Sequence, residues 1–282
     1  MLCFPAMRVE FTKMHGVGND FVVFDAPVPD SLLDPQRLRA LADRRTGIGF
    51  DQALLLGPPQ RLENAAYYRI FNADGDEVEQ CGNGARCIAA LLQRRGLARD
   101  GALTLESPAG LIRARLAADG EVAVDLGVPD FNPRSLPFDA SAEADSYALE
   151  LGGQTVQIGV VSLGNPHAVL SVPSVERAPV AQLGPLIEHH ARFPKRVNAG
   201  FLEIVTRDTV RLRVYERGAG ETRSCGTGAC AAVAVARRRG LLDPEVRVEV
   251  RGGALRVNWA GMGEHIWLTG PAHISFQGHV EV

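Results

Sequence analysis

One segment of the chain occurs twice, and this repeat constrains the fold more than any other feature. Residues 77–97 read EVEQCGNGARCIAALLQRRGL, and residues 221–241 read ETRSCGTGACAAVAVARRRGL. In each copy a cysteine, Cys81 or Cys225, precedes a glycine-rich turn, an apolar stretch, a basic run and a final Gly-Leu. The two cysteines stand 144 residues apart in a chain of 282 residues, so each copy can belong to a larger duplicated unit.

Polar residues upstream of the two cysteines recur in the same register. Two of them are separated by 33 residues in both copies, and a third precedes its cysteine by nine residues. The matched pairs are Asn19 with Asn165, Gln52 with Asn198, and Asn72 with Glu216. The chain therefore looks like a duplicated unit of roughly 140 residues.

Each copy mixes strand-like and helix-like segments. Strands are predicted where β-branched and aromatic residues cluster. Their ranges are 8–14, 21–26, 67–73 and 102–107 in the first copy, and 156–163, 167–172, 201–206 and 210–216 in the second. Helices are predicted at 34–45, at 179–193 and after each cysteine; the post-cysteine stretches are apolar nearly all round, which indicates burial. We expect an α/β fold of the α+β type, with two pseudo-symmetric domains whose strands wrap around a central buried helix.

The junction between the halves is predicted at the Pro-rich, aperiodic stretch Leu126–Pro137. This places the first half at residues 1–126 and the second at residues 127–270. The two halves are expected to meet with their cysteine ends facing, with an active site in the cleft between them.

Composition excludes several classes of protein. The net charge of −3 and the lack of a block of like charge argue against a nucleic-acid or membrane surface. The only lysines, Lys13 and Lys195, lie in no recognisable Schiff-base motif. Five cysteines are an odd number that does not suggest a disulfide framework, so we expect a cytoplasmic protein. The opening residues 1–6 are too short for a signal peptide and are interpreted as an unstructured extension.

A cysteine at a helix N-terminus has a definite chemistry. The macrodipole favours the thiolate there, so the pKa of each thiol is expected to fall from about 8.5 toward neutrality. The following glycines let a ligand carboxylate reach the free backbone N–H groups. Two such cysteines on opposite sides of one carbon could remove a proton from one face and return one to the other, with no metal and no pyridoxal cofactor.

Cysteines can also serve structural, metal-binding or redox roles. Cys87 and Cys230 lie within the predicted helices and are interpreted as small core residues. Spacings of six and five residues do not match a zinc site, so no metal is expected. A disulfide between Cys81 and Cys225 would be possible as an oxidised form but would not explain the matched polar residues. Neither glycine-rich turn carries a complete nucleotide-binding motif.

The motifs MHGVGNDF, FNADGDEVEQCGNGARC, GNPH and VYERGAGETRSCGTGACA closely resemble those of the diaminopimelate epimerase family. The resemblance runs from Met7 over nearly the whole chain and implies interconversion of LL- and meso-diaminopimelate without a cofactor, in lysine and cell-wall precursor synthesis. It also implies a homodimer and a C-terminal tail, residues 271–282, that returns to the first domain. Two departures from the family pattern, Ala168 after GNPH and the extension before Met7, do not touch the proposed chemistry.

Residue roles follow from the resemblance, motif by motif. Cys81 and Cys225 would be the acid–base pair, exchanging roles with the direction of the reaction, and His167 and Glu216 would tune their pKa values. The reacting carboxylate would lie at Gly82-Asn83 and Gly226-Thr227. The remaining substrate contacts implied are Asn19, Gln52, Asn72, Asn165, Asn198, Glu216 and Arg217. A bidentate Arg217 suits a second, distal carboxylate, and Glu216 suits a distal ammonium.

Two further hypotheses stay open at the level of sequence. A racemase or epimerase of a cyclic amino acid would share the two cysteines, but such relatives typically carry Cys-Gly-His where this chain has Asn83, and they would have less need of Arg217. A non-catalytic or thiol-redox binding protein would not need an acid and a base together with every matched polar partner.

Overall fold

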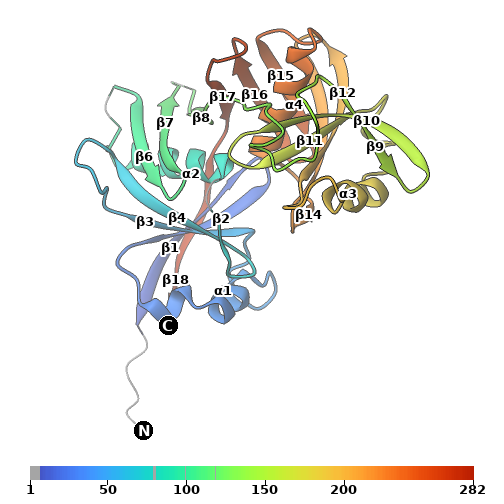
Figure 1. Ribbon diagram of the computed structural model, residues 1–282. Coiled ribbons are helices and arrows are strands. Elements are labelled where there is room, and N and C mark those ends of the chain that lie inside the picture. The colour runs from blue at the N-terminus through green and yellow to red at the C-terminus, as the bar shows by residue number, and fades with distance from the viewer. Residues whose placement is uncertain (1–6, 79–80, 99, 118) are drawn as a thin grey trace. The chain divides into compact units, whose positions relative to one another are not determined.

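The computed structural model describes residues 7–78, 81–98, 100–117 and 119–282 (Figure 1). The predicted extension, residues 1–6, lies outside the described residues. Over the described part of the chain there are eighteen strands, four α-helices and one short 3₁₀-helix, η1 (Asp30–Leu33). The chain divides into two compact units, residues 1–124 with 271–282, and residues 125–270.

The first unit is a mostly antiparallel sheet with two helices. Its neighbouring strands follow the order β18-β1-β2-β3-β4-β6-β7-β8, with β2–β3 and β4–β6 parallel. The short β5 pairs with β4. The elements are β1 (Arg8–Gly16), β2 (Asn19–Asp25), α1 (Pro35–Ala42), β3 (Gln52–Gly57), β4 (Ala66–Asn72), β5 (Glu77–Val78), α2 (Gly82–Arg94), β6 (Ala102–Ser107), β7 (Gly110–Leu116), β8 (Val122–Asp125) and β18 (His273–Glu281).

The second unit repeats this topology. Its order is β9-β10-β11-β12-β13-β15-β16-β17, with β11–β12 and β13–β15 parallel and β14 paired with β13. The elements are β9 (Tyr147–Leu151), β10 (Gln154–Ser162), β11 (Pro166–Ser171), α3 (Val180–Glu188), β12 (Asn198–Thr206), β13 (Thr209–Glu216), β14 (Gly220–Glu221), α4 (Gly226–Arg238), β15 (Glu245–Val250), β16 (Gly253–Trp259) and β17 (Ile266–Gly270). Matching order and direction confirm the predicted fold class of two pseudo-symmetric halves.

The C-terminal strand completes the first unit. β9 precedes the β10–β11 hairpin in the second unit and pairs with β10. The equivalent place beside β1 is taken by β18, which pairs antiparallel with it from Arg8 opposite Glu281 to His15 opposite His273. The second unit therefore begins with its own first strand, β9. In the first unit the equivalent position is filled by β18, from the C-terminal end of the chain.

Helices α2 and α4 form the centre of their units. All residues from Gly82 to Leu92 and from Gly226 to Ala236 are buried. Helix α2 packs on β1, β2, β6 and β7, and α4 packs on β10–β13, β16 and β17. The repeated Gly-Leu stops each helix: Gly96 has φ 74° and Gly240 has φ 73°, and the N–H of the following leucine bonds the carbonyl five residues back.

The other two helices are shorter than the sequence predicts. Helix α1 begins after Asp34, whose carboxylate accepts from Gln36 N and Arg37 N, and it ends at Ala42. The Asp43 carboxylate accepts from the next free N–H groups, those of Arg45 and Thr46, which offers the backbone an alternative to continuing the helix. Helix α3 ends at Glu188, although its pattern extends to residue 193.

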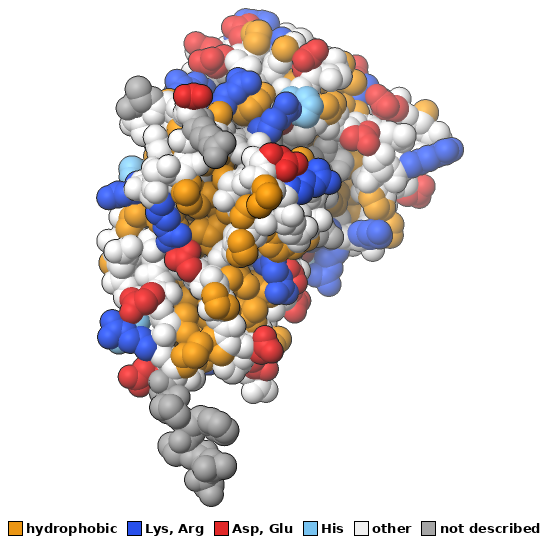
Figure 2. All heavy atoms as spheres, turned by 90° about the vertical axis from the view of Figure 1, so that its left-hand side faces the viewer, with side chains coloured by type: hydrophobic (Ala, Val, Ile, Leu, Met, Phe, Trp, Pro, Cys, Tyr) orange, Lys and Arg blue, Asp and Glu red, His pale blue; other side chains and the backbone are white. Residues whose placement is uncertain are grey.

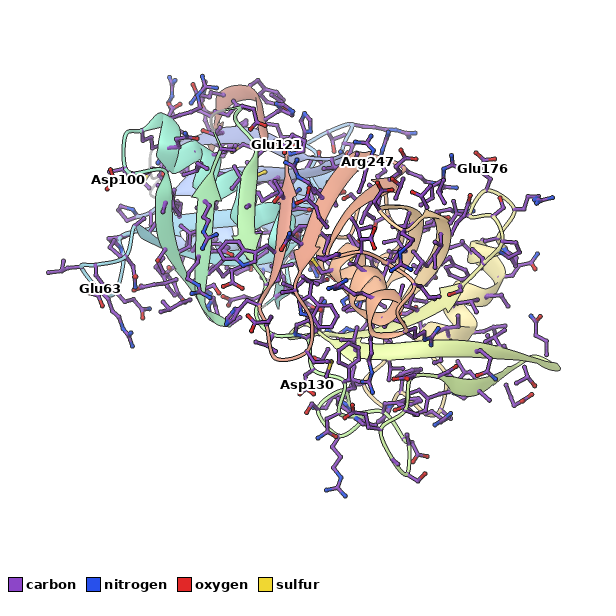
Figure 3. All side chains as sticks on the ribbon, turned by 90° about the horizontal axis from the view of Figure 1, so that it is seen from above. Glu63, Asp100, Glu121, Asp130, Glu176 and Arg247 are labelled. Atoms are coloured by element: carbon purple, nitrogen blue, oxygen red, sulfur yellow. The ribbon has the colours of Figure 1, made fainter. Side chains whose placement is uncertain are left out.

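The predicted junction, residues 126–137, packs within the second unit, which begins at residue 125. Leu126, Phe131 and Leu136 are buried in the second unit, and Asp130 bridges to Ser162. Charged side chains such as Glu63, Asp100 and Glu176 instead lie exposed on loops of their own units (Figure 3). No helix of the described residues is long and apolar enough to cross a membrane.

Candidate active site

In the first unit, Cys81 caps the central helix. Its backbone is extended (φ −144°, ψ 111°), and its Sγ accepts a hydrogen bond from Gly84 N at 3.4 Å. A Cβ at Gly84 would lie 3.3 Å from Cδ2 of Leu54, tighter than an ordinary contact, so glycine lets the first helical turn pack closely on β3. The half-buried sulfur of Cys81 therefore lies at the positive end of the α2 dipole.

A strained hairpin turn brings Asn19 to this cysteine. Val17 and Gly18, between β1 and β2, both have positive φ (56° and 82°), as a two-residue type I′ turn requires, and valine is unusual there. The Oδ1 of Asn19 accepts from Asn83 Nδ2 at 3.1 Å and from the Cys81 thiol at 3.8 Å. Asn19, Cys81 and Asn83, which the resemblance implies as site residues, thus lie together in one cluster of the first unit.

Asp51 fixes the orientation of the Asn19 amide, and the sequence patterns did not single it out. Its Oδ2 accepts from Asn19 Nδ2 at 2.9 Å, so the carbonyl end of Asn19 faces the cysteine. Asp51 is in turn paired with Arg44 at 2.8 Å. The only signal in the sequence was its position next to Gln52.

Gln52 and Asn72 pair with each other across β3 and β4, with Gln52 Nε2 donating to Asn72 Oδ1 at 2.9 Å.

In the second unit, Cys225 caps helix α4 and lies at the end of a polar chain. His167 Nε2 lies 2.9 Å from Asn165 Oδ1, Asn165 Nδ2 donates to Thr227 Oγ1 at 3.4 Å, and Thr227 Oγ1 lies 3.7 Å from Cys225 Sγ. An amide oxygen can only accept, so Nε2 of His167 carries the proton. The hydroxyl hydrogen of Thr227 is then available for the sulfur.

The predicted direction of the Cys225 pKa is wrong. Cys225 is 4% exposed, and burial raises the pKa of its thiol well above the ordinary value. The negative charge and hydrogen bonding of Glu216 beside it raise that pKa further, while Gly228 N and Thr227 oppose the shift only in part. Loss of water and a neighbouring carboxylate outweigh the helix dipole here. Cys225 is a protonated thiol at neutral pH.

His167 is neutral for the same kind of reason. It is 1% exposed, and burial, with the nearby Arg217 charge, lowers its pKa to about 3. The imidazole therefore enters the polar chain as a neutral donor.

Asn198, Glu216 and Arg217 gather at the end of β13. The buried Asn198 donates through Nδ2 to Pro166 O at 3.0 Å and accepts through Oδ1 from Arg217 N at 2.9 Å. Glu216 accepts from Thr222 Oγ1 at 2.5 Å, and the exposed Arg217 donates through Nη1 to Lys195 O at 3.3 Å. Thr222 is a further residue that the sequence patterns did not single out; its distance of three residues from Cys225 was no distinctive signal.

The remaining cysteines match their predicted structural role. Cys87 and Cys230 are fully buried within the two central helices, and burial raises the pKa of Cys87 to about 12. Cys81, Cys87, Cys225 and Cys230 form no disulfide within the described part of the chain. Among the described residues, no group of three or more His, Cys, Asp or Glu side chains could hold a metal ion.

Two units of one topology, each with a cysteine at the start of its central helix, define the fold. Solved structures share this fold: a hydroxyproline epimerase from Agrobacterium vitis has a TM-score of 0.71 at 20% identity, covering 98% of this chain and 93% of that one. A phenazine biosynthesis PhzF-family protein from Enterococcus faecalis has a TM-score of 0.67 at 12% identity, with coverage of 98% and 100%.

Sequence comparison then selects one family with this fold. The family model described as Diaminopimelate epimerase matches residues 11–132 and 159–275. The diaminopimelate epimerase of Stutzerimonas stutzeri (strain A1501) is 51% identical over 276 residues, covering 98% of this chain and all of the relative. That of Laribacter hongkongensis (strain HLHK9) is 54% identical over 276 residues, covering 97% and 99%. The chain belongs to the diaminopimelate epimerase family.

Proposed function

We propose that the protein interconverts LL- and meso-2,6-diaminopimelate by moving a proton at one α-carbon, in the synthesis of lysine and peptidoglycan precursors. The observation that carries this is full-length identity of about one half to diaminopimelate epimerases. The presence of a cysteine at the N-terminus of each central helix supports the chemistry.

The two thiols act as base and acid on opposite faces of the α-carbon. In the direction that begins from a protonated Cys225, the Cys81 thiolate takes the α-proton, the electron pair of the broken C–H bond passes into the substrate carboxylate, and Cys225 delivers its proton to the opposite face of the carbon. The thiolate and the thiol exchange places, so no net oxidation occurs. In the reverse direction Cys225 accepts and Cys81 donates. Burial and Glu216, which raise the pKa of Cys225, support its role as the donor at rest.

The carbanion needs a place for its charge. The N–H groups at the starts of the two helices, at Gly82-Asn83 and Gly226-Thr227, are suited to one carboxylate because a helix N-terminus combines backbone donors with a positive dipole. Charge that develops on the carboxylate in the transition state would be stabilised there. This mechanism requires both half-sites to engage the same α-carbon.

The distal end of the substrate needs a second set of contacts. We assign its carboxylate to Arg217 and its ammonium to Glu216, and its remaining polar contacts to the matched amides. Those amides are Asn19, Gln52, Asn72, Asn165 and Asn198. Neutral amides can orient two zwitterionic ends without adding charge.

We further propose a cytoplasmic homodimer that uses no cofactor. The free thiols are compatible with a reducing compartment. Apolar side chains gather on one face of the first unit (Figure 2). The exposed large apolar residues of this unit include Leu111 and Phe276. Sedimentation equilibrium should give twice the chain mass; a monomer at micromolar concentration would remove this part of the proposal.

Proton NMR in D₂O tests the reaction. Reduced protein without added cofactor should remove the α-proton signal of LL-diaminopimelate and produce the meso isomer, while a parallel sample of L-proline stays unchanged. Exchange of proline alone would move the activity to a cyclic amino acid, and silence in both samples would favour a binding protein.

Variants test the two-base mechanism in the same assay. Cys81→Ser and Cys225→Ser should each lower turnover by at least about 10³-fold, because each removes an acid–base group that acts directly on the substrate. Cys87→Ala and Cys230→Ala are matched controls in the same helices and should retain activity. Activity like that of the wild type in either serine variant would contradict the mechanism.

A further inference from the structure

We propose that Glu188 is a positioning residue that holds Arg217 ready for the distal carboxylate of the substrate. This inference rests on the proposed function, in which Arg217 binds that carboxylate. Glu188 is the last residue of α3 and is only 3% exposed. A carboxylate at the C-terminal end of a helix is in an unfavourable electrostatic position, and burying it adds to the cost, so its partners must compensate.

The first partner lies in the backbone of the turn that carries Arg217. Glu188 Oε1 accepts a hydrogen bond from Gly218 N at 2.8 Å. The N–H of Arg217 itself donates to Asn198 Oδ1 at 2.9 Å. Two consecutive N–H groups, one belonging to Arg217 and one following it, are therefore fixed by side chains from other elements.

The second partner of Glu188 is Arg196, which follows the residue whose carbonyl accepts from Arg217. Arg217 Nη1 donates to Lys195 O at 3.3 Å. The next residue, Arg196, has φ 59°, a left-handed conformation that is unfavourable for a non-glycine residue. Arg196 Nη1 pairs with Glu188 Oε1 at 3.9 Å. One carboxylate oxygen thus links the turn that carries Arg217 with the loop whose carbonyl holds its guanidinium.

Helix α3 also packs directly on β13, the strand that ends at Glu216. A Cβ at Gly184 would lie 2.5 Å from Cγ of Tyr215, so the helix packs closely on the residue that precedes Glu216. The first unit contains a similar brace with the opposite polarity: Arg39, in the last turn of α1, donates to Asp74 O at 2.6 Å in the turn after Asn72. Both units brace this turn, but only the second unit's turn carries an arginine.

The kinetic signature follows from where Arg217 would act. A contact to the distal end of the substrate is equally strong in the ground state and the transition state, so weakening it raises KM and leaves kcat unchanged. Glu188→Ala should raise the KM for LL-diaminopimelate about tenfold, because it removes a charge-assisted bond and the preorganisation of Arg217. Glu188→Gln keeps an acceptor oxygen for Gly218 N, so its KM should stay within about threefold of wild type.

Two variants guard against a simple loss of folding. Glu188→Asp keeps the charge but withdraws the oxygen by about 1.5 Å, the length of one carbon–carbon bond, and should also raise KM. Glu106→Ala is the matched control, because Glu106 is 5% exposed and accepts from Gln60 N at 2.6 Å and Arg61 N at 3.0 Å in a loop of the first unit. Its KM should be that of the wild type, with thermal unfolding measured for every variant.

The outcomes separate this inference from the proposed function. Arg217→Lys serves as the reference and should raise KM. If Arg217→Lys raises KM while Glu188→Ala and Glu188→Asp do not, Glu188 does not position Arg217. If Arg217→Lys leaves KM unchanged, the proposed role of Arg217 itself fails. A fall in kcat, or a displaced pH profile of kcat, in folded Glu188→Ala would show that Glu188 acts on the Cys225 thiol instead, and would also overturn the inference.

Discussion

Glu216 offers a direct test of what keeps Cys225 protonated. Its negative charge and hydrogen bonding raise the pKa of the Cys225 thiol, in addition to the effect of burial. A like charge at hydrogen-bonding distance shifts a pKa by about 1 to 3, which agrees with a Coulomb energy of about 4 kcal/mol at 4 Å in a medium of intermediate polarity. Glu216→Gln keeps the size of the side chain and removes the charge. The pKa of Cys225 should therefore fall in this variant, because the neighbouring negative charge is gone.

Alkylation with iodoacetamide measures the change. At a pH below the pKa, the fraction of thiolate rises about tenfold for each unit by which the pKa falls. A less basic thiolate is also a weaker nucleophile, and this cancels roughly half of the gain on a logarithmic scale. We therefore expect the alkylation of Cys225 at pH 8 to be about 3- to 30-fold faster in Glu216→Gln than in the wild type. Mass spectrometry of the peptide from Ser224 to Arg237 reads the modification at Cys225 and at the buried Cys230 together.

Glu221→Gln is the matched control. Glu221 lies close by in the sequence but is paired with Arg213 at 2.7 Å and Arg251 at 3.0 Å, so its loss should leave Cys225 unchanged. Cys230 should stay unmodified in all samples, which shows that the protein remains folded. Equal rates in wild type and Glu216→Gln would refute the electrostatic reasoning. Acceleration of Cys225 and Cys230 together would mean that the variant merely opens the structure.

Two further predictions concern stability, measured by urea denaturation. Burial lowers the pKa of His167 from 6.5 to about 3, so the stability contributed by the neutral imidazole is complete above pH 6.5 and is lost as pH falls toward 3. Between about pH 6 and pH 4 the free energy of unfolding of the wild type should fall by about 1.4 kcal/mol per pH unit more than that of His167→Gln. Equal slopes would contradict a neutral buried imidazole. A Cβ at Gly159 in β10 would overlap Val235 of α4, so Gly159→Ala should lower the free energy of unfolding by about 1 to 3 kcal/mol. An unchanged value would show that the two elements can separate freely.

The sequence alone determined the architecture and proposed the residues of both half-sites. The repeated cysteine segment and its matched polar residues predicted two similar units, each around a buried helix, because a duplication preserves spacing along the chain. It also named Cys81, Asn83 and Asn19 as site residues, which the structure brings together in the first unit. Helix ends were less predictable, since at Asp43 a side chain competes with the backbone for the same N–H groups.

Only the tertiary structure decided the state of the second cysteine and the supports behind the site. The two cysteines look equivalent in the sequence, yet Cys225 is buried beside Glu216 and its pKa rises instead of falling. Asp51 and Glu188 became visible only through their contacts with Asn19 and Gly218. The physical reason is that a pKa and a hydrogen bond depend on how much water is excluded and on which charges lie nearby. Those are set by residues distant in sequence that the fold brings together, whereas spacing along one strand or helix is written in the sequence itself.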